Sequence, residues 1–455
     1  MDKVAVCVPP GKCDVYGHLT RYAEQLAATG MARGVPVEIL RYESPDFIPR
    51  LFAHLRDETA VVHFHAFLYD LMIGGSPDLT QQIHALEDAR ATVLATISDH
   101  PFTDFMQNMV RNAHPRTNFI VLEKTFPDEM RCMNPALDAA HFDHQPFGPP
   151  QNYDPRIAIP FKSRAFDLVV PVHLVDLTNR GITQLVAKLG ASWLVQAMTA
   201  TYELTVGDLS RNPFHTFMES LSAALGGASF ADIRAHRPEA ATPILNALSA
   251  VDGVIRQERR HKMVKSLLRS VGKAKVAVLS RPLPGLDVDE GVEFLGVRQT
   301  PKVIRLMADT RAVLNCNPTY PSYLHERVTV GMMYGSCVIT DANPYITETF
   351  SKSELLHYAP GSSLSLKDLL ATHDVAAIGA AGAARVHGDR AFSWDGHFDQ
   401  LTRVVTAARD RNPIKIPSAR RPITLNGRDA GIRHTQGDTA LPRLRTGQHS
   451  SLHPT

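Results

Sequence analysis

The chain has 455 residues, of which 44% are hydrophobic and 21% charged, and its net charge is +2. At roughly 150 residues per domain this length predicts two or three domains, and the composition excludes a disulfide-stapled miniprotein, a collagen-like chain and a disordered one. Because the five cysteines are odd in number and widely spaced, and no apolar run approaches the roughly 20 residues of a membrane-spanning helix, we expect a soluble cytoplasmic protein.

The charge is unevenly distributed along the chain. After residue 412 the sequence holds seven basic and two acidic residues, a net charge of +5 that leaves −3 for the rest. A mildly acidic body lacks the basic face of a nucleic-acid-binding domain, so nucleic acid is not an expected partner. The basic segment 412–455 predicts a flexible tail, and peripheral contact with the inner membrane face is the alternative we keep for it.

The first 150 residues alternate short β-rich runs with helix-length segments, which is typical of parallel strands joined by crossover helices. The predicted strands are 3–8, 35–41, 59–65, 91–97 and 118–122. The predicted helices are 18–28, 45–55, 80–89 and 104–111. We therefore expect a Rossmann-like domain over residues 1–150.

A proline-rich stretch follows this domain. It holds five prolines between residues 146 and 160, and proline continues neither a helix nor a central strand. The sequence therefore predicts a linker at 151–165.

A second alternating series begins after the linker. Its predicted strands are 168–174, 275–279, 292–294, 312–315 and 337–340, and its predicted late helices are 366–372, 375–386 and 394–411. The segment 182–274 is mostly helical by pattern. We expect a second Rossmann-like domain over 166–390 with a helical insert, followed by a closing helix at 391–411. In such an α/β fold, ligands bind in the cleft at the carboxyl ends of the strands.

The loop after the first predicted strand excludes two common nucleotide-binding motifs. It contains Gly11 and Gly17, but not at the spacing of a dinucleotide-binding fingerprint, and no Walker A loop is present. A nicotinamide or flavin dehydrogenase and a P-loop hydrolase are therefore not expected. We also expect no bound cofactor and no metal.

The stretch 313–341 is the most informative part of the sequence. It predicts a strand, a Pro/Tyr loop, a helix that opens near His325 or Glu326 and stops at Gly335, and a strand that ends at Asp341. A helix amino terminus with a guanidinium and an imidazole beside it suits an anion such as the diphosphate of a nucleotide-sugar.

This stretch resembles a known family. The block 314–350 contains His-Glu-Arg at 325–327, Gly-Ser-Cys-Val-Ile-Thr-Asp at 335–341 and Asn-Pro-Tyr at 343–345. In these elements it resembles the carboxyl-terminal domain of GT-B glycosyltransferases of the group 1 branch, and specifically the CgeB-like, spore-maturation-protein-like proteins. Two amino-half elements, Ser-Asp-His-Pro-Phe at 98–102 and the segment 142–149, also resemble this branch.

The resemblance implies a GT-B fold, an acceptor-side amino half and a donor-binding carboxyl half. Many retaining members carry two glutamates eight positions apart around the helix that ends at the glycine. Aligned on Gly335, those positions hold Ser322 and Val330, and Glu326 is the only acidic residue of the block before Asp341. Their absence leaves the stereochemistry open.

The resemblance also implies site residues. Arg327 and then His325 are the candidates for stabilising the departing diphosphate, with Glu326, Asn317 and Arg180 as further donor contacts. The alternatives are a helix-surface ion pair for Arg327, a dipole-complementing residue for Glu326 and a solvated loop charge for Arg180.

On the acceptor side, Asp99 and His100 are the candidates for a general base, with Asp99 orienting His100 or acting as the base itself. Their alternative is that Asp99 caps the helix starting near Thr103 while His100 packs. His18 is a weaker acceptor-side candidate.

Three functions follow from these residues. The first is a metal-independent glycosyltransferase of the hexosyltransferase type, acting in glycan biosynthesis on a glycan, lipid-linked or protein acceptor. The second is a catalytically silent GT-B-like module that binds nucleotide-sugar or glycan. The third, a sugar epimerase of the same fold, needs carboxylates around the sugar that the sequence does not identify.

Overall fold

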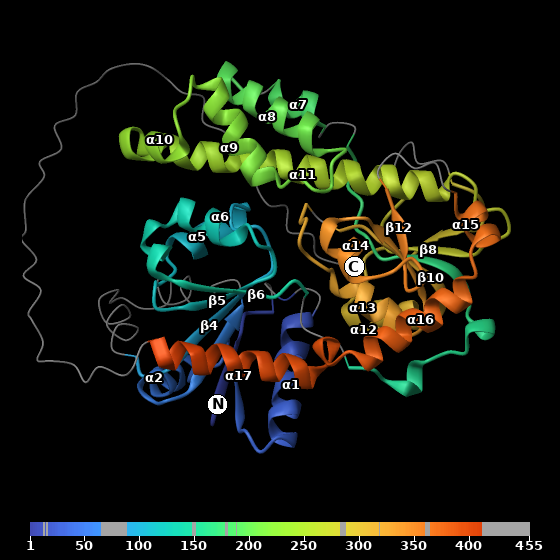
Figure 1. Cartoon of the computed structure of the whole chain (residues 1–455), viewed down its shortest axis with the longest axis horizontal. Coiled ribbons are helices and arrows are strands. Elements are labelled where there is room, and N and C mark those ends of the chain that lie inside the picture. The colour runs from blue at the N-terminus through green and yellow to red at the C-terminus, as the bar shows by residue number, and fades with distance from the viewer. Residues whose placement is uncertain are drawn as a thin grey trace, which may run out of the picture. The chain divides into compact units, whose positions relative to one another are not determined.

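The computed structural model describes residues 1–11, 14, 17–64, 89–147, 152–177, 181–187, 189–282, 288–317, 319–359 and 365–411. Within them lie two parallel six-stranded sheets with associated helices (Figure 1). This confirms the predicted α/β class and the two Rossmann-like sheets. The basic tail lies outside the described residues.

The first sheet is formed by the amino-terminal half. Its strands are β1 (Val4–Val8), β2 (Val37–Arg41), β3 (Ala60–Phe64), β4 (Thr92–Ile97), β5 (Asn118–Val121) and β6 (His141–His144). They lie in the order β2-β1-β3-β4-β5-β6, and every pair is parallel. The strand β1 is buried along its whole length because helices cover a parallel sheet on both faces. The strand order reverses between β1 and β3, and a ligand site is expected at this switch point.

Four α-helices accompany the first sheet within the described residues. They are α1 (His18–Ala32), α2 (Phe47–Arg56), α5 (Asp104–Arg111) and α6 (Phe126–Met133), with a 3-10 turn at Pro135–Ala139. The predicted helix 80–89 falls almost wholly within 65–88, outside the described residues. The other three helix predictions are confirmed, whereas α6 has no counterpart in the sequence prediction.

The second sheet is formed by the carboxyl-terminal half. Its strands are β7 (Phe166–Val170), β8 (Val276–Val278), β9 (Val292–Phe294), β10 (Thr310–Asn315), β11 (Cys337–Asp341) and β12 (Leu356–Tyr358). They lie in the order β12-β11-β10-β7-β8-β9 and are parallel throughout. The switch point of this sheet lies between β7 and β10.

A block of five helices follows β7, as predicted for 182–274. They are α7 (Ile182–Val186), α8 (Ser192–Thr205), α9 (Pro213–Ala224), α10 (Phe230–His236) and α11 (Pro238–Leu268). Buried residues of α8, α9 and the first half of α11 share one apolar core with the first sheet, whereas the end of α11 packs on the second sheet. This insert therefore contacts both halves.

The remaining helices are α12 (Thr300–Ala308), α13 (Glu326–Met333), α14 (Pro344–Thr349), α15 (Leu366–Thr372), α16 (Val375–Gly388) and α17 (Trp394–Arg411), with 3-10 turns at Pro155–Ile157, Phe161–Ser163 and Arg390–Phe392. The helix α17 returns to the amino-terminal half and lies beside α1 (Figure 1). There Arg33 pairs with Asp395 at 2.7 Å and with Asp399 at 2.6 Å.

Some sequence predictions differ from the structure in this half and at the sheet edges. The predicted strand 168–174 is β7, which ends at Val170 because Pro171 has no N–H for the next rung. The edge strands β6 and β12 were not predicted, since one is half-exposed and polar and the other has three residues. The two halves pack into one compact unit, Met1–Ile414, with no division at the proline-rich stretch. The linker at 151–165 and the domain bounds therefore stay predictions.

Candidate active site

A cavity of about 470 Å³ lies between the carboxyl ends of the two sheets. Its lining residues follow strands β1, β3, β4, β7, β8 and β10, so both switch points open into it. This volume is in the range of small-molecule sites. The sequence prediction of a ligand cleft between the halves thus corresponds to a cavity in the described residues.

The amino-terminal wall begins at the first turn of α1. Asp14 caps this turn, since its Oδ1 accepts from the N–H of Leu19 at 3.0 Å and its Oδ2 from that of Thr20 at 2.8 Å. Gly17, with φ of 71°, supplies the left-handed backbone that enters the helix. These contacts place His18 at the cavity, and its acceptor-side role stays a prediction.

Two aromatic rings extend this wall. Tyr22 and Phe64 meet edge to face with ring centroids 4.6 Å apart, and both line the cavity. The Tyr22 hydroxyl lies 2.8 Å from Nε2 of His397 on α17, and Nδ1 of His397 lies 3.3 Å from Nε2 of Gln145. Because the Gln145 amide nitrogen is a donor, His397 accepts at Nδ1 and donates from Nε2 to Tyr22. Burial lowers the pKa of His397 to about 4 and keeps it neutral.

The carboxyl-terminal wall begins at the helix α13. His325 has extended backbone and caps α13, and its Nδ1 lies 3.3 Å from the N–H of Arg327 and 2.8 Å from Oε2 of Glu326. Partial burial favours protonation of Glu326, but the charges of His325 and Arg327 outweigh it and hold the pKa of this carboxyl well below its ordinary value. The triplet predicted at 325–327 therefore lines the cavity together, at the start of a helix.

Four arginines line this side of the cavity: Arg298 follows β9, and the other three come from helices. Arg256 and Arg260 come from α11, at i and i+4 on one face, and Arg327 comes from α13. Burial, followed by the charges of Arg327 and Arg256, lowers the pKa of Arg260 to about 10, so it stays charged at neutral pH. The Nη1 of Arg327 and the Nε of Arg260 are buried and have no hydrogen-bond partner within the described part of the chain. Unpaired buried donors of this kind suit an anionic ligand.

Arg256, in contrast, is neutralised by an acidic neighbour. The Nε of Arg256 lies 2.6 Å from Oδ2 of Asp252, one turn earlier on α11. Burial alone would lower the pKa of Arg256, but Asp252 and then Tyr320 and Asp99 raise it above its ordinary value. The guanidinium also stands over the Tyr320 ring, 5.2 Å from its centroid.

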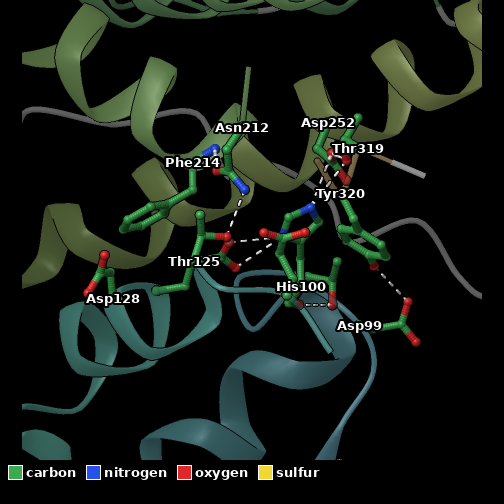
Figure 2. A network of polar contacts seen from close by, with 12 residues as sticks. Asp99, His100, Thr125, Asp128, Asn212, Phe214, Asp252, Thr319 and Tyr320 are labelled. Carbon is green, nitrogen blue, oxygen red and sulfur yellow. Dashed lines mark hydrogen bonds and ion pairs between the residues drawn. The ribbon is translucent and has the colours of Figure 1, made fainter. Parts of the chain in front are cut away.

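The loop after β4 carries the predicted acceptor-side pair, and the structure separates its two members. Asp99 lines the cavity and accepts from the Tyr320 hydroxyl at 3.3 Å, as Figure 2 shows. His100 does not line the cavity: its side chain is 0% exposed, with Nδ1 3.0 Å from Glu129 and Nε2 3.2 Å from Thr319.

Asp99 therefore neither orients His100 nor caps the helix at Thr103, which has no side-chain cap. Burial lowers the pKa of His100 and raises that of Glu129, so the pair is fixed inside the protein rather than presented to a ligand. Of the two candidates, Asp99 alone reaches the cavity.

The structure also shows what occupies the two positions aligned with the absent glutamates. Val330 lines the cavity. Ser322 turns to the amino-terminal half, where its N–H donates to Oε2 of Glu123 at 2.8 Å and its hydroxyl donates to the same carboxylate. Among the residues that line the cavity, the carboxylates are Asp99 and Glu326.

Of the two other donor-side candidates, Arg180 lies outside the described residues, so its role stays a prediction. Asn317 is buried away from the cavity: its N–H donates to Oδ2 of Asp341 at 3.1 Å and its Oδ1 accepts from Asn315 at 3.1 Å. Asp341, at the end of the neighbouring strand β11, holds the backbone of Asn317 inward, and the donor contact expected of Asn317 stays a prediction.

Sequence analysis missed Arg260, Tyr320 and Tyr22 as cavity residues. The spacing of Asp252, Arg256 and Arg260 by four on a predicted helix was a usable signal, but it did not reveal which way that face points.

No group of three or more His, Cys, Asp or Glu side chains in the described residues is placed to hold a metal ion. No described helix is both long and apolar enough to cross a membrane.

A family model described as glycosyl transferase-like matches residues 256–403. No curated protein matched the chain. Solved structures with a similar chain course include HepE from Anabaena in complex with UDP and glucose, at 11% identity over 90% of this chain and 100% of that one with a TM-score of 0.43. Sucrose-phosphate synthase from Thermosynechococcus elongatus is 13% identical over 90% of this chain and 100% of that one, with a TM-score of 0.43.

A glycosyltransferase from Rickettsia africae gives 11% identity over 89% of this chain and 98% of that one, with a TM-score of 0.39. The narrower CgeB-like assignment stays a prediction. The matched segment 256–403 contains the four arginines that line the cavity, which are Arg256, Arg260, Arg298 and Arg327.

Proposed function

We propose that the protein is a glycosyltransferase that uses a nucleotide-diphosphate-sugar donor without a bound metal. The observation that carries the proposal is the division of charge in the cavity. Arg260 and Arg327 offer unpartnered donors on one wall, and the Asp99 carboxylate lies on the other. The match of residues 256–403 to the glycosyl transferase-like family supports the same reading.

The donor side acts on the leaving group. When the bond between the sugar C1 and the diphosphate oxygen breaks, the electron pair leaves with the diphosphate and negative charge grows on its oxygens. Arg260, Arg327 and the positive end of the α13 dipole are placed to stabilise that charge, which is the role a divalent cation fills elsewhere. The arginines therefore account for the proposed metal independence.

The acceptor side acts on the incoming hydroxyl. Asp99 takes the proton of the acceptor hydroxyl while the acceptor oxygen forms the new bond to C1. The aromatic wall of Tyr22 and Phe64 leaves an apolar surface beside this carboxylate. A sugar-bearing acceptor, whether a free glycan, a lipid-linked glycan or a glycosylated protein, fits such a wall.

The test is release of nucleoside diphosphate from a panel of nucleotide-sugars, with EDTA or Mg²⁺ added. A thermal-shift screen with UDP, GDP, ADP and dTDP first identifies which nucleobase the protein prefers, because a ligand that binds only the folded state raises the stability of the protein. We expect one donor to turn over equally well in EDTA and turnover to collapse in Arg327→Ala. A Mg²⁺ requirement would contradict the proposed metal independence.

A second candidate is a catalytically silent module that binds nucleotide-sugar. The observation that favours it is the pair Ser322 and Val330, which leaves two carboxylates of many retaining relatives without counterparts in the cavity. Nucleotide binding without release from any donor or acceptor would support this module. Turnover that depends on Asp99 would exclude it.

A further inference from the structure

The Tyr320 hydroxyl joins the charged groups of the two cavity walls. It donates to Oδ1 of Asp99 at 3.3 Å and accepts from Nη2 of Arg256 at 3.3 Å. Its ring is 2% exposed, and its edge meets the rings of Phe126 and Tyr323 with centroids 5.5 Å and 5.4 Å away. The ring therefore has little freedom to move its hydroxyl.

The groups behind Tyr320 are fixed in turn. Asp252 holds Arg256 at 2.6 Å and accepts a hydrogen bond from the Thr319 hydroxyl. Thr319 is also bonded to His100, whose ring lies 4.5 Å from that of Tyr320. Figure 2 shows this network converging from the amino-terminal half, the helical insert and the loop before α13. Such a network holds a hydroxyl in one direction more firmly than a single contact does.

We propose that Tyr320 is a positioning residue that holds the Asp99 carboxylate toward the cavity, and that the Asp252–Arg256 ion pair fixes the Tyr320 hydroxyl for this task. This inference rests on the proposed role of Asp99 as the base. Tyr320 does not touch the acceptor proton itself; it acts through Asp99. Arg256 belongs to the helical insert and lies on the donor wall. Through its hydrogen bond to Tyr320 it nevertheless helps to hold Asp99 on the acceptor side.

The Tyr320 hydroxyl donates a hydrogen bond to Oδ1 of Asp99 and so fixes the direction of that carboxylate. Removing the hydroxyl leaves the carboxylate free to turn away from the acceptor. The expected consequence is a lower kcat with little change in the donor KM.

Tyr320→Phe tests this with the ring packing kept. We expect kcat for donor hydrolysis or transfer to fall about tenfold, with donor KM within about twofold. Tyr153→Phe is the control, because it removes the hydroxyl of an exposed tyrosine outside the cavity lining, and its kcat should match the wild type. A wild-type kcat in Tyr320→Phe overturns the proposal.

A second measurement does not depend on turnover. In a double-mutant cycle on unfolding, Tyr320→Phe and Asp99→Asn should be non-additive, because both remove the same hydrogen bond. Additive changes overturn the positioning role even if the enzyme is active. If the wild type has no turnover with any donor, the proposed function fails, and the cycle alone still decides whether Tyr320 holds Asp99.

Discussion

The two walls of the cavity differ in how their charges are partnered. On the carboxyl-terminal wall, Arg260 and Arg327 keep donors without partners, whereas Arg256 is paired with Asp252. On the amino-terminal wall, Asp99 is held by one hydroxyl, and the neighbouring His100 and Glu129 satisfy each other out of reach of the cavity. Charges that are left free mark where a ligand binds, and charges that are paired mark what keeps the walls in place.

The largest expected effect is on the amino-terminal wall. Asp99→Asn removes the proposed base with little change of shape, so kcat should fall about 10³-fold. Nucleoside diphosphate affinity should stay within about twofold, because the arginines are untouched. Steady-state kinetics and calorimetry measure the two quantities. A variant that keeps full kcat would show that the amino-terminal wall does not supply the base.

The stability that His397 gives the amino-terminal wall should depend on pH. His397 has a pKa of about 4 in the folded protein, below its ordinary value of about 6.5, so the unfolded chain binds more protons between these pH values. The free energy of unfolding should therefore decrease as the pH falls from about 6.5 to 4, by about 3 kcal/mol from this group.

Urea unfolding of the wild type and His397→Gln at pH 7 and pH 4.5 measures this loss. The variant should lose less stability than the wild type on acidification. Substitution of the exposed His236 by Gln is the control and should follow the wild type. Equal losses of unfolding free energy in all three proteins would show that His397 does not cause the acid sensitivity.

On the opposite wall, Arg260 and Arg327, each with one buried donor atom that has no partner in the described residues, should contribute to binding. Arg260→Ala and Arg327→Ala each remove a charged donor, and we expect nucleoside diphosphate affinity to weaken about ten- to a hundredfold. Arg269→Ala is the matched control, because it removes the same charge from the exposed end of α11. If the control weakens binding as much as the cavity variants, the effect is general electrostatics.

The smallest expected effect is at the contact that crosses between the halves. Ser322→Ala removes the hydroxyl that donates to Glu123, and burial already raises the pKa of that carboxyl. We expect a loss of about 1 kcal/mol in the free energy of unfolding and an unchanged nucleotide affinity. Weaker nucleotide binding with unchanged stability would place Ser322 in the donor site instead.

The sequence predicted the central strands and the site helix well. The strands β1, β3, β4 and β10 are short apolar runs, and the start of α13 at Glu326 with a stop near Gly335 follows from its local signals. Of the four edge strands, β2 and β9 were predicted, whereas β6 was missed because it is polar and half-exposed, and β12 because it has three residues. The site was harder, since Arg260 and Tyr320 are brought to the cavity by packing between segments far apart in the chain.

Asn317 and His100 lie away from the cavity for the same reason. Each stands after a strand, where a cleft residue is expected, but a buried acidic partner, Asp341 or Glu129, turns it inward. No local pattern announces such a partner. Asp99, one residue before His100, was predicted by the same argument and does reach the cavity.

The most direct test of the account is a calorimetric titration of the wild type with a nucleoside diphosphate and with the matching monophosphate, in EDTA. The central claim is that Arg260 and Arg327 bind the phosphate that the monophosphate lacks. We therefore predict that the diphosphate binds at least about tenfold more tightly. Equal affinities, or binding of neither nucleotide, would contradict the claim.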